Sequence, residues 1–245
     1  MADRLRYNLI DNLRAFSIIS MVLYHAAWDL VFLYGFDWQW YKNLPGFIWQ
    51  QSICWCFIIL AGFCHSMGRK PFKNALKVFS AGLLVSAVTW IITPNIRITF
   101  GVLTLIGSSG LIVCVCNKLL RRIKPELGLA LFALFFLLFR EINRGYLGFS
   151  AFELCSIPKS LYDNYFTAFI GLPPKGFYSS DYFSLLPWLN LYLFGYYLHK
   201  VFSKYSIMKL LSGRRIKAFS WLSKHSLIIY LLHQPVISAL LYLIF

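Results

Sequence analysis

The first apolar segment of the chain, "LIDNLRAFSIISMVLYHAAWDL" at 9–30, carries the ionisable side chains Asp11, Arg14, His25 and Asp29. An α-helix turns by ~100° and rises by ~1.5 Å per residue, so Arg14 and His25, eleven positions apart, fall on one stripe of a helix. Asp11 and Asp29 lie three and four residues from these basic neighbours, which places them on the same face. The spacing therefore predicts one polar face on an otherwise apolar helix.

The His25 end of this face is typical of acid–base chemistry. A carboxylate at Asp29 can fix the tautomer of an imidazole and support its positive charge. We interpret His25 and Asp29 as a catalytic pair, with Trp28 beside them as a contact for a substrate. At the other end of the helix we interpret Asp11 and Arg14 as a structural ion pair, because ionisable groups in a membrane segment are usually paired.

Three further polar residues are candidates for binding a substrate. His233 and Gln234 lie inside the last apolar segment, just before Pro235, where they either bind a substrate or form hydrogen bonds between helices. Asp181 opens "DYFSLLPW" and either binds a substrate hydroxyl or caps the helix that follows. The residue types leave both pairs of alternatives open.

The cysteines do not predict a metal site. Cys54 and Cys56, like Cys114 and Cys116, are two positions apart, and residues at that spacing point to different sides of a helix. We interpret these cysteines as small apolar residues. His65 falls at the end of an apolar segment, where an interfacial histidine is ordinary.

The composition defines the elements that position these residues. Of the 245 residues, 59% are hydrophobic and only 13% are charged, a balance far from that of a soluble domain. Apolar runs such as "LGLALFALFFLLF" are apolar on every face, unlike the alternating strands of a membrane β-barrel. The sequence therefore predicts an all-α, polytopic integral membrane helical bundle.

The basic residues set the topology of this bundle. Most of the 24 Lys and Arg residues fall in clusters beginning at Arg4, Arg69, Lys118 and Lys200, in every second connection. This pattern follows the positive-inside rule, so the net charge of +15 reflects topology rather than binding to nucleic acid. We expect the N-terminus inside, no cleavable signal peptide, and one domain spanning 1–245. The seven expected spans are 9–34, 47–67, 75–93, 98–117, 127–139, 182–201 and 226–245.

A long outer connection at 140–181 is either a lid or a passive connector with a surface helix around "LYDNYFTAF".

Three segments carry a resemblance to a known family. They are "RYNLIDNLRAFSIISMVLYHAAWDL" at 6–30, "YSSDYFSLLPWLNLYLFGYYLHK" at 178–200 and "SKHSLIIYLLHQPV" at 223–236. In this order they resemble the signatures of bacterial relatives of heparan-α-glucosaminide N-acetyltransferase, in its catalytic region. The ten residues between Arg14 and His25 also resemble the arginine–histidine spacing of the integral-membrane O-acyltransferases, which belong to the same transmembrane acyltransferase superfamily.

This resemblance implies transfer of an acyl group, typically acetyl, from cytosolic acetyl-CoA to a hydroxyl or amine of an extracytoplasmic sugar or glycan. It implies His25 as general base or transient acyl carrier, and it implies a bacterial cytoplasmic membrane. Arg14 would bind the CoA donor with Arg69 and Lys70.

The sequence departs from the family at two places. The segment "LYGFDWQWYKNLPGF", which follows His25, has no histidine, and Thr104 stands where many bacterial relatives are expected to have one.

Two other classes of protein remain as alternatives. A secondary transporter also holds charges at mid-membrane, but it should show repeated halves with paired broken helices, and the sequence shows none. A membrane scaffold for envelope assembly would tolerate the loss of His25. Neither alternative requires binding of acyl-CoA. The sequence leaves the oligomeric state open, a homodimer included.

Overall fold

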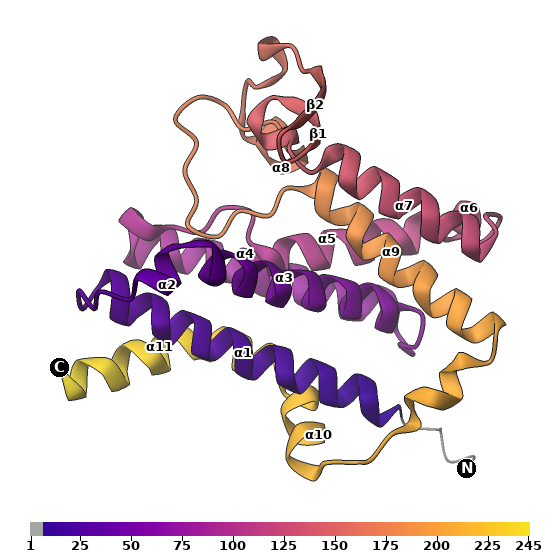
Figure 1. Ribbon diagram of the computed structural model, residues 1–245, viewed down its shortest axis with the longest axis horizontal. Coiled ribbons are helices and arrows are strands. Elements are labelled where there is room, and N and C mark those ends of the chain that lie inside the picture. Colours follow the sequence, from indigo (N-terminus) through magenta and orange to yellow (C-terminus); the bar gives the residue numbers. More distant parts are fainter. Residues whose placement is uncertain (1–6) are drawn as a thin grey trace. The chain divides into compact units, whose positions relative to one another are not determined.

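The computed structural model describes residues 7–245 and is mostly helical (Figure 1). Arg4 and Arg6, part of the first basic cluster, lie outside the described residues. The helices of the described residues are α1 (Asn8–Phe32), α2 (Gln39–Lys42), α3 (Leu44–His65), α4 (Pro71–Ile92), α5 (Val102–Val115), α6 (Asn117–Leu120), α7 (Pro125–Phe139), α8 (Tyr165–Ile170), α9 (Leu185–Lys204), α10 (Lys217–Lys224) and α11 (Ser226–Ile244). Two strands, β1 (Tyr146–Phe149) and β2 (Phe152–Ser156), and the 3-10 turns η1 (Pro94–Ile96), η2 (Ile142–Arg144), η3 (Lys159–Leu161) and η4 (Ile207–Ser212) complete the described elements.

Each of the seven expected spans coincides with a helix, namely α1, α3, α4, α5, α7, α9 and α11. The all-α fold class is therefore confirmed. Four of these helices, α1, α3, α4 and α11, are long and apolar enough to cross a membrane. The helix α5 is apolar but has 14 residues, and α7 has 15, fewer than the ~20 that cross a hydrocarbon core without tilting or thinning the bilayer. The count of seven spans stays a prediction.

The chain forms two compact units, each described here by itself. The first contains residues 1–60 and 202–245, and the second contains residues 61–201. The single domain expected over 1–245 stays a prediction.

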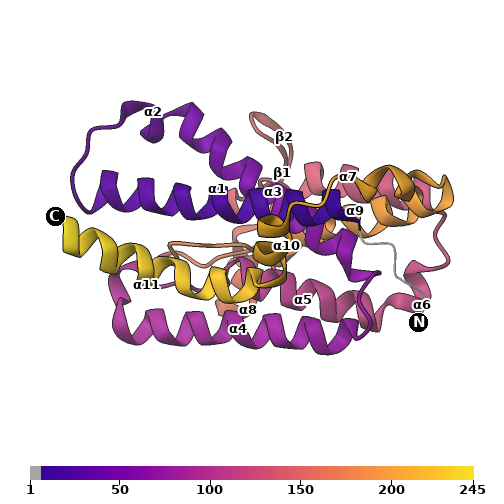
Figure 2. The ribbon, with the colours of Figure 1, turned by 90° about the horizontal axis from the view of Figure 1, so that it is seen from below.

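In the first unit, α10 and α11 pack along α1, and Figures 1 and 2 both show α11 beside α1. Amide side chains hold the entry to α10 against the start of α1. Asn8 Nδ2 donates to the carbonyls of Ser212 and Gly213 at 2.9 and 3.0 Å, and Asn12 Nδ2 donates to the Arg214 carbonyl at 3.2 Å. These bonds fix the register in which the two ends of the chain meet.

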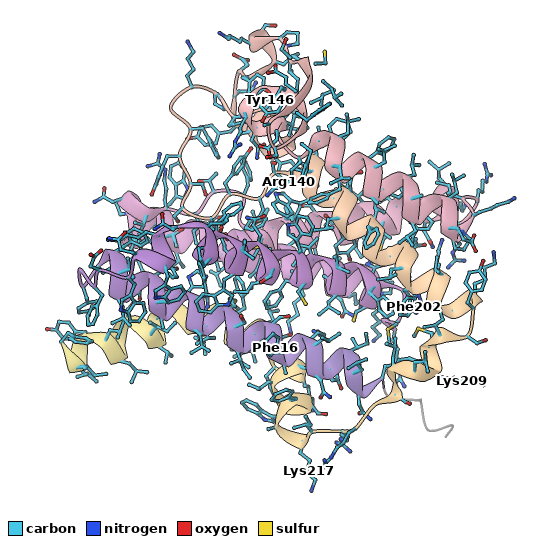
Figure 3. The ribbon with its side chains drawn as sticks, in the orientation of Figure 1. Phe16, Arg140, Tyr146, Phe202, Lys209 and Lys217 are labelled. Carbon is cyan, nitrogen blue, oxygen red and sulfur yellow. The ribbon has the colours of Figure 1, made fainter. Side chains whose placement is uncertain are left out.

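The opposite side of α1 is apolar and exposed. Phe16, labelled in Figure 3, lies nine residues before His25, which is about half a turn away around the helix. Leu13, Phe16 and Leu23 are 40%, 64% and 57% exposed. In a membrane helix such a side suits lipid, so the polar face of α1 turns toward protein.

In the second unit, α4 and α5 run side by side at very close range (Figure 2). Glycines permit this approach: a Cβ added to Gly107 would lie 2.4 Å from backbone atoms of Phe79, and one added to Gly82 would lie 2.5 Å from the Thr104 nitrogen. Small residues at helix contacts are the usual way in which membrane helices gain van der Waals packing.

The expected outer connection contains a hairpin that the sequence did not reveal. Strands β1 and β2 pair antiparallel, with Tyr146 opposite Ser156, and every residue of β2 is exposed. An exposed strand lacks the apolar alternation by which strands are recognised. The short helix expected around "LYDNYFTAF" is present as α8, which begins after the capping residue Asn164.

Figure 3 shows Arg140 at the end of α7, near the hairpin that carries Tyr146. The guanidinium of Arg140 lies 4.9 Å from the ring centre of Trp188 in α9. This cation–π contact joins the end of α7 to the start of α9.

The close contact of α4 with α5 predicts that Gly107→Ala destabilises the protein. The new methyl group would overlap the Phe79 backbone, and overpacking of this kind costs ~1–3 kcal/mol. Thermal unfolding of detergent-purified protein measures the change. Gly68→Ala is the matched control, because a Cβ there would lie 3.5 Å from its nearest neighbours, and it should unfold like the wild type. Equal unfolding of both variants would contradict the prediction.

Candidate functional site

The polar face of α1 meets polar residues of α10 and α11 in the first unit. All four ionisable residues of α1 lie at this boundary, and each contacts a side chain from the end of the chain. The contacts are Ser223 Oγ to Asp11 Oδ1 at 3.0 Å, Arg14 Nη2 to Ser226 Oγ at 3.1 Å, the His25 and His233 rings with centres 4.7 Å apart, and Gln234 Nε2 to both Asp29 oxygens.

The order of these contacts shows that α1 runs parallel to the α10–α11 segment. Residue numbers rise together on both sides, from Asp11 opposite Ser223 to Asp29 opposite Gln234. Asp11 and Arg14 lie one turn apart on α1, and their partners are Ser223 near the end of α10 and Ser226 at the start of α11.

Ser223 and Ser226 are functional candidates that the sequence alone does not indicate. They are three residues apart, as Asp11 and Arg14 are, but nothing in the sequence says that these two segments meet.

His233 is held in one tautomer. Its Nδ1 lies 2.5 Å from the Tyr230 carbonyl, an atom that only accepts, so Nδ1 must carry the hydrogen. In the neutral ring, Nε2 is then an acceptor, and this atom is buried with no hydrogen-bond partner among residues 7–245. The structure therefore holds a basic nitrogen ready at the boundary of α1 and α11.

His25 contacts two aromatic rings. The His233 ring lies 4.7 Å away and the Tyr24 ring 6.0 Å away, both roughly edge to face. Within the described part of the chain, no hydrogen bond restrains either nitrogen of His25. The imidazole is half-buried and keeps both nitrogens for a ligand.

Asp29 is fully buried and is bound by an amide. Gln234 Nε2 donates to the two carboxylate oxygens at 2.8 and 2.9 Å, while Gln234 Oε1 is buried without a partner among the described residues. No hydrogen bond joins Asp29 to His25 in residues 7–245. The carboxylate thus positions Gln234 directly, and its expected effect on the His25 tautomer stays a prediction.

The remaining candidates divide between the two units. Arg14 belongs to the first, whereas Arg69 and Lys70 are exposed in the connection from α3 to α4, in the second. The structure does not test whether these three bind one ligand. The ion pair expected between Asp11 and Arg14 also stays a prediction. Trp28 packs against the aromatic cluster around Tyr41, which leaves its expected contact with a substrate untested.

Asp181 belongs to the second unit and caps a different helix from the one expected. Its Oδ2 accepts a hydrogen bond from the backbone nitrogen of Val102 at 3.3 Å, so it caps α5 rather than α9, which follows it in sequence. The sequence could not show this, because Val102 is distant along the chain. Burial raises the pKa of the Asp181 carboxyl to about 6, and the Val102 hydrogen bond opposes the rise.

No group of three or more His, Cys, Asp or Glu residues among 7–245 is arranged to hold a metal ion. The polar side chains of the α1–α11 boundary suit proton transfer and hydrogen bonding.

One comparison with known proteins identifies relatives. The model of the family described as heparan-alpha-glucosaminide N-acetyltransferase, catalytic, matches residues 6–235. No curated protein and no solved structure matches the chain. The match covers nearly the whole chain and includes every candidate residue discussed above.

The hydrogen bonds from Gln234 to the Asp29 carboxylate predict that loss of Gln234 costs more stability when residue 29 is charged than when it is neutral. Gln234→Leu removes the donor from a buried carboxylate and should destabilise the protein by ~1–3 kcal/mol. Asp29→Asn removes the charge, so adding Gln234→Leu to it should cost less than Gln234→Leu alone. Thermal unfolding of the three variants completes this test. Ser238→Leu, at an exposed position of α11, is the control for the new leucine. Equal costs in both backgrounds would refute the role of the charge.

The environment of Asp181 predicts a pH dependence of stability. An unfolded carboxyl titrates near 3.8 and the folded one near 6, so the folded state binds the proton more tightly. Stability should be highest below about pH 4 and fall as the pH rises through 6, by a total on the order of 2–3 kcal/mol. Asp181→Asn should abolish this fall while keeping an acceptor for Val102. Thermal unfolding between about pH 4 and 8 measures it. Glu153→Gln, an exposed carboxyl, controls for net charge, and a fall that persists in Asp181→Asn would count against the prediction.

Proposed function

The chain belongs to the heparan-alpha-glucosaminide N-acetyltransferase catalytic family, and on this basis we propose that it moves an acetyl group from cytosolic acetyl-CoA to an extracytoplasmic sugar or glycan. Family membership makes it a transmembrane acyltransferase, in agreement with its four membrane-length apolar helices. The donor, the acceptor and the roles of individual residues below belong to the proposal. So do a bacterial cytoplasmic membrane and an N-terminus inside.

One observation carries the proposal: the His25 ring lies against His233, whose Nε2 is a buried and unpartnered acceptor. A thioester carbonyl is already electrophilic, so the protein's main tasks are to deprotonate the acceptor and to hold it in place. Two imidazoles and an amide at one boundary supply groups suited to both tasks.

In the proposed mechanism, His25 takes the proton of the attacking hydroxyl or amine. The acceptor oxygen or nitrogen then bonds to the acetyl carbonyl carbon, and the carbon–sulfur bond of acetyl-CoA breaks with its electron pair on sulfur. The imidazolium of His25 returns the proton to the CoA thiolate. In the covalent variant, a nitrogen of His25 bonds to the acetyl carbon, and the carbon–sulfur bond breaks with its electron pair on the CoA sulfur. The acceptor then attacks this acyl-imidazole, takes the acetyl group and frees His25, and the acceptor proton passes to the CoA thiolate.

The neighbouring side chains bind the sugar. His233 Nε2 and Gln234 Oε1 are acceptors, so they suit the hydroxyl hydrogens of a sugar, which offers many donors. Asp29 keeps the Gln234 amide turned so that its oxygen faces away from the carboxylate. Trp28 and Asp181 are further proposed contacts of the acceptor.

Arg14 is proposed to contact the donor. One of its nitrogens donates to Ser226, and a guanidinium has five N–H donors, so others remain for a phosphate or pantetheine oxygen. Arg69 and Lys70 are exposed cations proposed for the phosphates of CoA.

His25→Ala should keep the fold and lose activity. Removal of a general base typically costs 10²- to 10⁴-fold in rate. The measurement is release of acetate and transfer to glucosamine or N-acetylglucosamine from radiolabelled acetyl-CoA by detergent-purified protein. Asp29→Asn should show a smaller loss, because Asp29 makes no hydrogen bond to His25 within residues 7–245 and acts on the site through Gln234.

His225→Ala is the matched control, since His225 lies after α10 and contacts the Trp221 carbonyl rather than the site. It should turn over acetyl-CoA like the wild type. If wild type neither binds nor consumes any acyl-CoA, the transporter or scaffold class replaces the proposal.

A further inference from the structure

The second unit contains a separate cluster of reactive side chains where α3, α5 and α9 meet. His65, at the end of α3, lies between a thiol and a phenol. Its Nε2 is 3.7 Å from Cys114 Sγ, and its Nδ1 is 2.9 Å from Tyr192 Oη. The sequence alone predicts an apolar role for Cys114 and an interfacial one for His65, and the fold brings the two side chains together.

This arrangement has the order of an activated nucleophile. A thiol that donates its hydrogen toward Nε2 leaves Nδ1–H to donate to the Tyr192 oxygen. The imidazole can then accept the thiol proton while the phenol keeps the ring in place. Cys114 thus contacts His65, and His65 contacts Tyr192, in the order nucleophile, base and orienting group. A base beside a thiol in this way favours the thiolate.

Close helix contacts hold the orienting phenol. Tyr192 is 3% exposed, and a Cβ added to Gly62 would lie 1.9 Å from its carbonyl oxygen. A Cβ added to Gly110 would lie 3.3 Å from the Tyr192 hydroxyl. The two glycines let α3 and α5 approach α9 so closely that the phenol has little room to turn.

Cations lie beyond the cluster along the same helices. Lys200 Nζ lies 4.5 Å from the Tyr196 ring centre and donates to the Leu120 carbonyl. Arg121 follows α6, and its Nε donates to Oδ1 of Asn117 at the start of α6. Asn117 lies three residues after Cys114. No carboxylate within residues 7–245 pairs with either cation. Two cations without acids suit the phosphates of a thioester donor whose sulfur lies at the thiol.

We propose that Cys114 receives the acyl group from an acyl-CoA thioester, with His65 as its base and Tyr192 as a positioning residue. His65 takes the thiol proton, and the sulfur of Cys114 bonds to the acyl carbon. The donor carbon–sulfur bond breaks, its electron pair stays on the CoA sulfur, and His65 returns the proton there. A thioester is exchanged for a thioester, so no further reactant is needed. This proposal rests on the proposed function.

Plain helix packing is the competing explanation, because a thiol–imidazole hydrogen bond also stabilises buried polar groups. If the contact serves packing alone, Cys114 need not react with acyl-CoA. If Cys114 is an acyl acceptor, it must become covalently labelled, and only in the folded protein.

The test is incubation of the detergent-purified full chain with radiolabelled acetyl-CoA and no sugar. The protein is then denatured, and samples with and without hydroxylamine treatment are digested for mass spectrometry. We expect a hydroxylamine-labile acetyl group on Cys114, absent from protein denatured before incubation. His65→Gln should slow labelling at least tenfold. Cys116→Ala, two residues along the same segment, is the matched control and should label like the wild type.

Tyr192→Phe tests the positioning role, because it removes only the hydroxyl. We expect a lower labelling rate and a displaced pH profile for alkylation of Cys114 by iodoacetamide. Tyr146→Phe, in strand β1, where the hydroxyl donates to the Ser150 carbonyl, is the control and should leave that profile unchanged. An unchanged profile in Tyr192→Phe would assign the phenol to packing alone.

The wild-type labelling needs no variant to fold, so it decides the proposal by itself. Wild type that turns over acetyl-CoA without an acetyl group on Cys114 would overturn the inference and leave the proposed function standing. If native and denatured protein are labelled equally, the label comes from non-enzymatic acetylation, and the inference is overturned. Wild type that neither turns over nor becomes labelled would overturn both proposals.

Discussion

A buried ionisable group in an apolar surrounding must find its partners within the protein, and the first unit is organised by this constraint. Water cannot satisfy Asp29, which is fully buried, so Gln234 of α11 supplies both of its hydrogen bonds. The same requirement pairs Arg14 with Ser226 at the other end of α1. Because these partners come from the last helices, the polar face of α1 fixes which helices lie beside it and in which direction they run.

The two candidate clusters solve this problem in different ways. At the α1–α11 boundary, the fixed tautomer of His233 leaves one acceptor without a partner beside the His25 imidazole, which makes no hydrogen bond within residues 7–245. In the second unit, His65 has a partner on each nitrogen. The first arrangement is open to a ligand that brings its own hydrogens, as a sugar does. In the second, Cys114 and Tyr192 already contact the two nitrogens of His65, so a proton can pass within the cluster from the thiol to the imidazole.

The sequence pattern predicts the helices and the residues that share a helix face, but it does not predict which helices contact one another. Apolar runs predicted the helices, and the helical period predicted that Asp11, Arg14, His25 and Asp29 share a face. The partners on α10 and α11 stand more than 200 residues away, so no spacing rule could identify them. The hydrogen bond from Val102 to Asp181 could not be predicted for the same reason. The Cys114–His65 contact could not be predicted either, because the two residues lie 49 positions apart in different apolar segments.

The parallel contact of the first helix with the last has a consequence for biosynthesis. Asp29 and Gln234 are 205 residues apart, so α1 leaves the ribosome well before α11, and Asp29 has no Gln234 to bind until α11 is made. During that interval the nascent chain exposes an unsatisfied carboxylate either to lipid or to the insertion machinery. A chain that stops before Gln234 therefore keeps a buried carboxylate in α1 without its amide partner.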